Sequence, residues 1–302
     1  MRGALKTFLF SGLFACMTSL GTAWAADKKP EPARDWMDSG RLLATSGVSQ
    51  VEGAAGGGLA SWAVISGYGT RDSVGGNLHG TYIGLPDFTL RSGGLSLGLF
   101  NRLELSYTRQ AFDTNETGPK LGLPSNYVFS QHIFGAKLRL IGDLVYDQDS
   151  FLPQLSAGLQ YKKNDRGNLV RALGAKSDHG TDFYLSATKL FLAQSLLVNA
   201  TARATKANQF GLLGFGGDKK SSYSTEFEGS LAYLLRRDLA IGVEYRTKPD
   251  NLSFAHEDDA WDIFAAWFIN KNLSATVAYV DLGDIALQTK QRGLYLSLQT
   301  GF

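Results

Sequence analysis

The C-terminal residues 292–302 constrain the fold most, because their side chains alternate in polarity with a period of two. One face of this stretch carries Leu294, Leu296, Leu298, Thr300 and Phe302. A β-strand places alternate side chains on opposite faces of its sheet. An exposed apolar strand that ends on an aromatic residue is a liability in water. The pattern therefore favours a strand whose outer face meets lipid.

This ending resembles the C-terminal assembly signal of bacterial outer-membrane β-barrels, although Thr300 stands where an aromatic residue is more usual. The resemblance implies that Phe302 is recognised by the barrel-insertion machinery. Beyond residue 25 the chain contains no run of eighteen apolar residues, so no helical span is predicted. The 35 glycines and 12% aromatic residues instead suit many closely packed strands.

The N-terminus is typical of an export signal. An apolar core at residues 13–20 follows a basic start, and the small residues Ala23 and Ala25 mark a cleavage site. We predict that residues 1–25 are a cleaved signal peptide, with an uncleaved anchor as the alternative. The single cysteine, Cys16, lies in this segment, so the exported chain would contain no disulfide and no cysteine metal ligand.

From Leu95 onward the sequence predicts β-hairpins. Eleven alternating stretches, separated by short turns and long polar loops in turn, cover 95–100, 103–112, 128–141, 152–162, 182–191, 196–206, 222–235, 239–246, 260–269, 273–280 and 293–302. Short turns at one end and long loops at the other are characteristic of outer-membrane barrels. An even strand number, with both termini on the periplasmic side, requires one further strand. Leu59–Tyr68 is the predicted first strand.

The predicted fold is therefore all-β, a transmembrane antiparallel up-and-down β-barrel of about 12 strands. Fourteen strands is the alternative, because Asn77–Arg91 alternates poorly and contains Pro86, which cannot donate a ladder hydrogen bond. This stretch could extend a neighbouring strand or form an extra hairpin. A soluble β-sandwich also alternates, but the export signal and the C-terminal phenylalanine favour the barrel.

Alternation also assigns the two faces of each strand. In 239–246, the apolar Ile241 and Val243 should face lipid while Glu244 and Arg246 face the lumen. Likewise, Ala200 should face lipid. Aromatic residues near strand ends could form the girdles found at membrane interfaces. They are Tyr107, Phe112, Tyr161, Tyr223, Tyr233, Tyr245, Trp261, Trp267 and Tyr279.

Five charged residues on three successive predicted strands point inward under the same alternation. They are Arg203, Glu226, Glu228, Glu244 and Arg246. One interpretation is a paired polar network that fills a narrow barrel, because buried charges persist only when they are paired. The other is a charged constriction that selects a permeating solute. Both interpretations place the cluster in the lumen.

Other polar groups could form chemical sites. Glu226 and Glu228 share a face and could act as an acid–base pair, but neighbouring arginines would oppose the necessary rise in pKa. Glu257, Asp258 and Asp259, with Asp262, could bind calcium or a lipopolysaccharide-bridging cation, or form a solvated acidic loop. The preferred interpretation assigns no catalytic residue and no metal ligand here.

Ser130 and His132 share one strand face, as the nucleophile and base of a barrel esterase would, but no companion motif accompanies them. The chain's four histidines lack zinc-site spacing. We therefore predict a protein that is not an enzyme and requires no cofactor. The net charge of +2 gives no support for nucleic-acid binding.

The glycine-rich stretch Gly53–Gly58 lacks the Lys-Ser/Thr ending of a phosphate-binding loop. It could form a bend before the first strand or fold inward and narrow the lumen. The surrounding residues 40–59, with Phe129-Ser130-Gln131 and residues 145–149, resemble the proteobacterial domain-of-unknown-function family 3034. The similarity extends through residues 152–154 and 158–163. It implies an exported outer-membrane protein and transfers no catalytic residue.

These observations divide the chain into a signal peptide (1–25), a periplasmic or lumen-inserted segment (26–58) and an outer-membrane barrel (59–302). The expected partners are outer-membrane lipid and lipopolysaccharide, the insertion machinery and a small solute. Passive passage or binding of that solute is the expected function. Lys137, Arg139 and Lys162 extend the inward positive charge, which favours anions. A sealed structural or interaction barrel and a lipid-modifying barrel enzyme are the alternatives.

Overall fold

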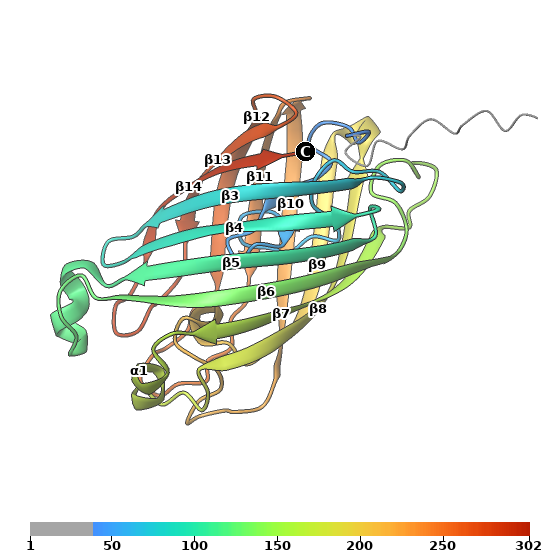
Figure 1. Ribbon diagram of the computed structural model, residues 1–302. Coiled ribbons are helices and arrows are strands. Elements are labelled where there is room, and N and C mark those ends of the chain that lie inside the picture. The colour runs from blue at the N-terminus through green and yellow to red at the C-terminus, as the bar shows by residue number, and fades with distance from the viewer. Residues whose placement is uncertain (1–38) are drawn as a thin grey trace, which may run out of the picture. The chain divides into compact units, whose positions relative to one another are not determined.

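A computed structural model describes residues 39–302 (Figure 1). The predicted signal peptide lies outside the described residues. Twelve antiparallel strands close into one barrel, each bonded to its sequence neighbours and the last bonded to the first. They are β3 (Val74–Gly84), β4 (Thr89–Leu99), β5 (Leu103–Asp113), β6 (Val128–Ile141), β7 (Gln154–Asn164), β8 (His179–Phe191), β9 (Leu196–Thr205), β10 (Ser224–Arg236), β11 (Leu239–Arg246), β12 (Ala260–Phe268), β13 (Leu273–Asp281) and β14 (Arg292–Gly301). The predicted all-β barrel of 12 strands is confirmed.

The predicted strand at Leu59–Tyr68 is wrong. These residues form no barrel strand, and the barrel instead begins with the β3–β4 hairpin around the ambiguous stretch 77–91. Pro86 lies in the turn between the two strands, where its missing donor interrupts no ladder bond. The strand total is unchanged because β4 extends the stretch predicted at 95–100 back to Thr89, and β3 replaces the misassigned strand.

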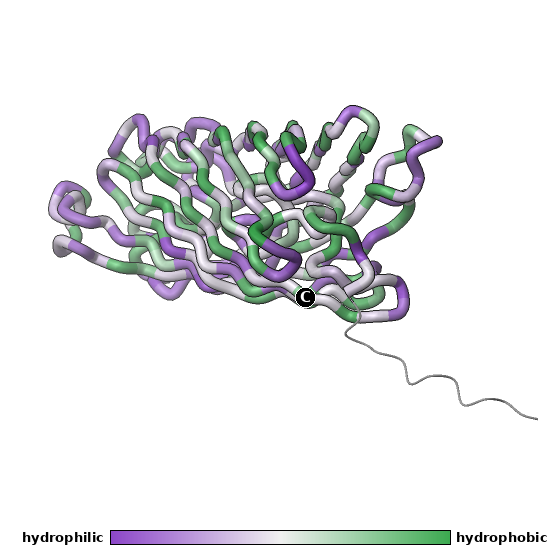
Figure 2. The backbone as a smooth tube through the Cα atoms, turned by 90° about the horizontal axis from the view of Figure 1, so that it is seen from above, coloured by the Kyte–Doolittle hydropathy of each residue, from purple (hydrophilic) through white to green (hydrophobic). Residues whose placement is uncertain are grey.

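Residues 47–69, which we call the lumen segment, are all buried. The segment contains the two short strands β1 (Val48–Ser49) and β2 (Ala55–Gly56), which pair with each other. Figure 1 shows this part of the chain, in blue, inside the ring of strands. Figure 2 shows how hydrophobic and hydrophilic residues alternate along the strands around it. The lumen segment begins and ends near the C-terminus, because the Ser49 amide donates to Gln299 Oε1 at 2.7 Å and the Tyr68 amide donates to the Phe302 carbonyl at 2.8 Å.

The outer surface of the barrel is apolar, as the alternation predicts. Val243 and Ala200 are exposed, whereas Glu244 and Thr201 are buried in the lumen. The aromatic residue Phe112 is a correction to the predicted girdle, because its side chain faces inward and is buried. Among residues 39–302, no helix is long and apolar enough to cross a membrane.

Most of the long connections lie at the end of the barrel opposite the C-terminus, whereas the β6–β7 connection, residues 142–153, lies at the same end as the C-terminus (Figure 1). They contain the short helices η1 (Asn115–Leu121), α1 (Gly167–Ala172) and η3 (Asn208–Gly211), whereas η2 (Leu192–Gln194) lies in a turn at the other end. The β9–β10 connection folds inward, and residues 207–217 are buried. The lumen is thus occupied by the lumen segment and covered at its outer end by this connection.

Candidate functional site

The wall of the barrel holds the lumen segment by its backbone. Glu244 Oε2 accepts a hydrogen bond from the Leu59 amide at 2.7 Å, and Glu228 Oε2 accepts one from the Ser61 amide at 2.7 Å. Neutral groups do the same, since Thr188 Oγ1 accepts from the Ala63 amide at 2.7 Å. A segment with little regular structure therefore satisfies its buried polar groups with wall side chains.

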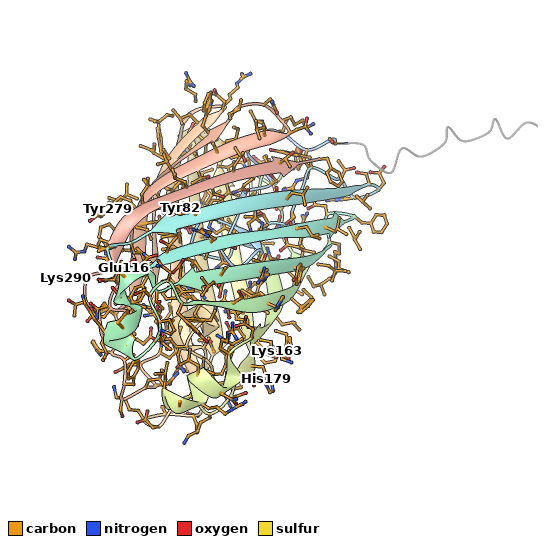
Figure 3. The ribbon with its side chains drawn as sticks, turned by 60° about the vertical axis from the view of Figure 1, so that its left-hand side comes forward. Tyr82, Glu116, Lys163, His179, Tyr279 and Lys290 are labelled. Carbon is orange, nitrogen blue, oxygen red and sulfur yellow. The ribbon has the colours of Figure 1, made fainter. Side chains whose placement is uncertain are left out.

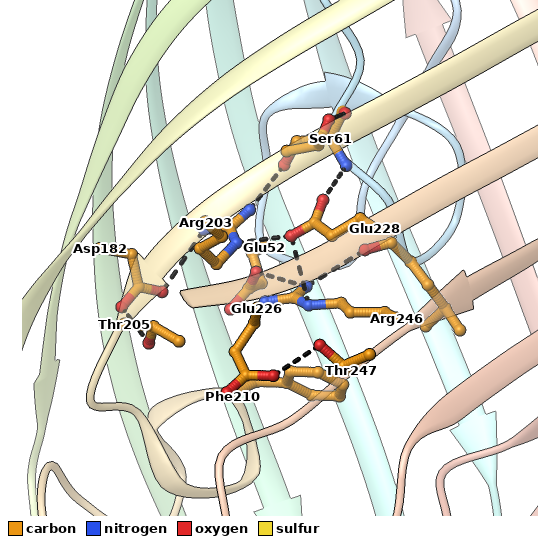
Figure 4. A network of polar contacts seen from close by, with 12 residues as sticks. Glu52, Ser61, Asp182, Arg203, Thr205, Phe210, Glu226, Glu228, Arg246 and Thr247 are labelled. Carbon is orange, nitrogen blue, oxygen red and sulfur yellow. Dashed lines mark hydrogen bonds and ion pairs between the residues drawn. The ribbon is translucent and has the colours of Figure 1, made fainter. Parts of the chain in front are cut away.

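Six charged side chains meet at the centre of the lumen. We call Glu52, Lys162, Asp182, Arg203, Glu228 and Arg246 the charge cluster. Figure 4 shows most of its members. Glu52 is the one member that belongs to the lumen segment, and it contacts both Lys162 and Arg246, the latter at 2.8 Å. The inserted chain therefore completes the cluster.

The wall residues of the cluster bind one another through Arg203. Its Nε donates to Glu228 Oε1 at 2.5 Å, and its Nη1 lies 3.4 Å from Asp182 Oδ2. Its remaining donors reach Gln160 and Ser61, both at 2.8 Å. The guanidinium is almost completely buried, so it requires this dense set of acceptors to offset the loss of water.

Glu52 remains ionised because of these neighbours. Burial alone would raise the pKa of its carboxyl group, but the positive charges of Arg246, Lys162 and Arg203 outweigh burial. The net result is a pKa well below the ordinary value for glutamate. An ionised carboxylate at this position is therefore an integral part of the closed lumen.

A second ion pair lies between β5 and β6. Lys137 Nζ is 3.2 Å from Glu104 Oε1 and also donates to the carbonyls of Ala55 and Val64. Glu104 in turn accepts from the amide of Ser66 at 2.9 Å. This pair therefore binds the lumen segment at Ala55 and again at Val64 and Ser66, on the side of the barrel away from β11.

The predicted cluster of five residues is brought together only in part. Arg203, Glu228 and Arg246 form ion pairs, whereas Glu226 accepts a hydrogen bond from Thr247 at 2.5 Å. Glu244 has no cation within 4 Å among the described residues. Glu226 and Glu228 therefore form no carboxylate pair.

Glu244 faces Asp262 instead, directly across the β11–β12 ladder. Both residues are buried, and the Asp262 oxygens have no hydrogen-bond partner among residues 39–302. Burial without a cation disfavours two negative charges at such close quarters. This pair lies beside the glycine-rich bend, because a Cβ added at Gly58 would be 3.3 Å from Asp262 Oδ2.

The buried part of the β9–β10 connection, residues 207–217, which we call the outer cover, contacts the charge cluster directly. The Phe210 ring lies under the Arg246 guanidinium at 4.3 Å, and the Phe210 carbonyl accepts from Lys162 Nζ at 3.2 Å. Figure 4 shows this ring below the arginine. Phe210 has a positive φ of 59°, which is unusual for a non-glycine residue.

The outer connections also contain a buried carboxyl group at Glu257. Its oxygens contact Lys248 Nζ at 3.4 Å and the amide of Gln209 at 2.9 Å. Burial raises the pKa of Glu257 to about 7, because Lys248 alone does not compensate for the lost water. Burial also lowers the pKa of Lys248.

The acidic stretch does not converge on a cation. Asp258 pairs with His256 and Asp259 accepts from Tyr245, while Asp262 faces the lumen. Within residues 39–302, no group of three or more His, Cys, Asp or Glu side chains is arranged to hold a metal ion. The acidic residues therefore serve three separate local structures.

Ser130 and His132 do not contact each other. The Ser130 hydroxyl accepts from Arg109 at 3.2 Å, and His132 Nδ1 shares a hydrogen bond of 2.9 Å with the Tyr107 hydroxyl. Phe302 contributes its backbone, which pairs with Gly76, while its ring packs against the same glycine. Its predicted role as an assembly signal remains a prediction.

The sequence pattern did not identify Glu52 and Asp182 of the charge cluster, or Glu104 of the second ion pair. Glu104 and Asp182 lie within predicted strands, and the inward parity of those strands could have identified them. Glu52 follows no period, so no signal in the sequence pairs it with Lys162 or Arg246. That pairing depends on the insertion of the segment.

A closed antiparallel barrel with an apolar outer surface, a polar interior and short turns at one end defines a bacterial outer-membrane β-barrel. The chain belongs to the family described as proteins of unknown function, DUF3034, whose sequence profile matches residues 45–299. The match includes the lumen segment as well as the barrel. No curated protein matches the chain significantly in sequence.

Among solved structures, the chain is similar to the KdgM porin in complex with disordered oligogalacturonate, with 12% identity and a TM-score of 0.49. That alignment covers 75% of this chain and 99% of the porin. The NanC porin aligns with 8% identity and a TM-score of 0.47, covering 75% and 98%. Outer membrane phospholipase A from Escherichia coli aligns with 8% identity and a TM-score of 0.41, covering 79% and 94%.

Proposed function

We propose that the protein is an outer-membrane channel for a small anionic solute, closed in this conformation by its own lumen segment. The charge balance of the charge cluster carries the proposal. The wall contributes three cations, Lys162, Arg203 and Arg246, and two anions, Asp182 and Glu228. Glu52 supplies the third negative charge from the lumen segment. Withdrawal of the segment therefore leaves the wall with one excess positive charge.

The chemistry of Glu52 indicates the class of solute. Lys162 and Arg246 bind a carboxylate that is not part of the wall, and a solute carboxylate or phosphate offers them the same acceptor oxygens. Rings of basic side chains favour anions in other pores. Hydrogen bonds and ion pairs join the lumen segment to the wall, and water and a solute can replace these contacts.

The test is single-channel recording in planar bilayers on a matched pair of variants. Glu52→Gln weakens the contacts to Lys162 and Arg246, so openings should become severalfold more frequent than in the wild type. Glu226→Gln makes the same chemical change on a wall carboxylate that bonds only Thr247, and its openings should match the wild type. Under a salt gradient, the reversal potential should show anion preference, reduced by Arg246→Gln.

Silence of the wild type, of Glu52→Gln and of a variant that combines Glu52→Gln with Phe210→Ala, with all three proteins folded by heat-modifiable gel mobility, would reject the channel. Cation-selective openings would reject the anionic solute. Equal increases in Glu52→Gln and Glu226→Gln would show that opening does not depend on release of the lumen segment.

A sealed barrel is the second candidate function, and one observation favours it. The β9–β10 connection closes the outer end independently of the lumen segment, through the contacts of Phe210 with Arg246 and Lys162. Persistent silence in a variant that combines Glu52→Gln with Phe210→Ala would support this candidate. Openings that appear only in the combined variant would show two gates in series.

A further inference from the structure

Four basic residues form a continuous row across the outer surface of neighbouring strands. Arg109 of β5 pairs with His132 of β6, His132 with Lys163 of β7, and Lys163 with His179 of β8. Arg109, Lys163 and His179 are exposed, and His132 is half-buried. Figure 3 shows Lys163 and His179 side by side near the outer connections. We call these four residues the basic row.

An aromatic row lies directly beside the basic row, on its periplasmic side. Tyr107, Phe134 and Tyr161 are cross-strand neighbours on the same outer surface. Aromatic belts of this kind lie at the boundary between acyl chains and headgroups. The basic row is one step further out along each strand, which places it at the headgroup level of the outer leaflet.

The two exposed, always-charged members of the row have no carboxylate partner. Within the described chain, no carboxylate oxygen lies within 4 Å of the charged nitrogens of Arg109 or Lys163. Arg109 makes one side-chain hydrogen bond, to the Ser130 hydroxyl at 3.2 Å. Most of its donors therefore remain available to an external acceptor.

The acidic residues nearest the row are engaged elsewhere. Asp165 accepts from the Ser130 amide at 2.9 Å, and Asp113 accepts from the Asn115 amide at 2.9 Å. Asp178 contacts His179 at 2.9 Å and Arg171 at 3.4 Å. Only His179, at the end of the row, is therefore paired with a carboxylate.

The opposite side of the barrel lacks such a row. The outer ends of β11, β12 and β13 carry Tyr245, Trp261 and Tyr279 on the lipid-facing surface. The nearest basic residue, Arg292 of β14, is already bound to Asp281 at 2.6 Å. The outer ends of β11, β12 and β13 therefore lack the unpaired positive charge that Arg109 and Lys163 place on β5 and β7.

We propose that the basic row binds the phosphate groups of lipopolysaccharide in the outer leaflet. Arginine and lysine side chains are the usual protein partners of phosphate. Four adjacent strands extend the row over about 14 Å, enough for a headgroup with more than one phosphate. The aromatic row beneath it provides the apolar surface against which the acyl chains of the same lipid pack.

The experiment measures lipid A binding to the full folded chain in detergent by native mass spectrometry, with EDTA present to remove bridging cations. The double variant Arg109→Ala/Lys163→Ala should bind bisphosphorylated lipid A at least tenfold more weakly than the wild type. The matched control, Arg236→Ala/Arg237→Ala, removes two exposed charges from the periplasmic turn and should bind like the wild type.

Two further probes identify the chemistry. Dephosphorylated lipid A should bind the wild type as weakly as bisphosphorylated lipid A binds the double variant. An excess of inorganic phosphate should not displace lipid A, because the acyl chains contribute to binding. Equal affinity of the wild type and the double variant, or an equal loss in the control, would overturn the proposal. Displacement by inorganic phosphate would show a simple anion site instead of a lipid site.

Discussion

Two buried glutamates, Glu52 in the lumen and Glu257 under the outer connections, have pKa values that burial and neighbouring charges shift in opposite directions. Glu52 has three cationic neighbours, and they hold its pKa well below the usual range in spite of burial. Glu257 has one, Lys248, and burial raises its pKa to about 7. The number of cations within reach, rather than burial itself, decides which carboxyl group is ionised.

The difference has a structural consequence. The charge cluster consists of mutually paired charges, and its carboxylate Glu52 stays ionised near neutral pH. The outer cover instead rests on a carboxyl group that titrates near pH 7, and Glu257 binds the Gln209 amide beside Phe210. We therefore expect the two closures to respond to different perturbations.

The largest effect should come from the charge cluster. Arg203→Met removes the side chain that contacts both Glu228 and Asp182, leaving buried carboxylates with fewer partners. The free energy of unfolding should fall by about 3–5 kcal/mol. Urea unfolding in lipid vesicles measures the change. Arg236→Met is the control, because its exposed pair with Asp238 contributes about 0–1 kcal/mol; similar losses in both variants would contradict a dry cluster.

Glu257 should contribute a pH dependence of stability between about pH 4.5 and 7. Its folded pKa lies above its unfolded pKa, so the folded protein holds the proton longer, and stability falls as pH rises through this window. The loss should reach about 3 kcal/mol. The contribution of Glu52 has the opposite sign and is lost only as pH falls below the window. Unfolding at pH 5 and pH 7.5 should show a smaller difference in Glu257→Gln; an unchanged difference would assign the dependence elsewhere.

A smaller effect should come from the neutral contacts of the lumen segment. Thr188→Val removes the acceptor of the Ala63 amide, and a buried amide without an acceptor costs about 1–3 kcal/mol. Thr201→Val removes instead a donor to the Ser61 carbonyl, which also accepts from Ser186 and Asn199, so its cost should be lower. Urea unfolding of the two variants distinguishes them, and the reverse order would contradict this account.

The smallest effect should come from Glu226→Gln. This carboxylate is half-buried and bonds Thr247, which an amide oxygen can still do. The free energy of unfolding should change by no more than about 0.5 kcal/mol. A loss of stability as large as that of Arg203→Met would contradict this prediction, because it would require Glu226 to pair with the charge cluster.

The strands and their faces could be predicted from sequence because alternation is a local property. Val243 and Glu244 are adjacent, and the pleat alone sends one to lipid and the other to the lumen. Phe112 does not belong to the predicted girdle, because its position in the alternation directs its side chain inward, where it contacts Phe88 and Phe129. An aromatic residue near a strand end thus indicates a girdle only if its parity agrees.

The sequence by itself determined a twelve-stranded outer-membrane barrel, the lipid-facing side of the strands from β5 onward, and the inward position of four members of the charge cluster, which are Lys162, Arg203, Glu228 and Arg246. Only the tertiary structure decided that residues 47–69 leave the sheet and fill its interior. Glu52 and Arg246 are 194 residues apart in the chain, and no local pattern encodes such a contact. Their pairing is settled by the free energy of burying charge, which depends on what surrounds each group after the barrel has closed.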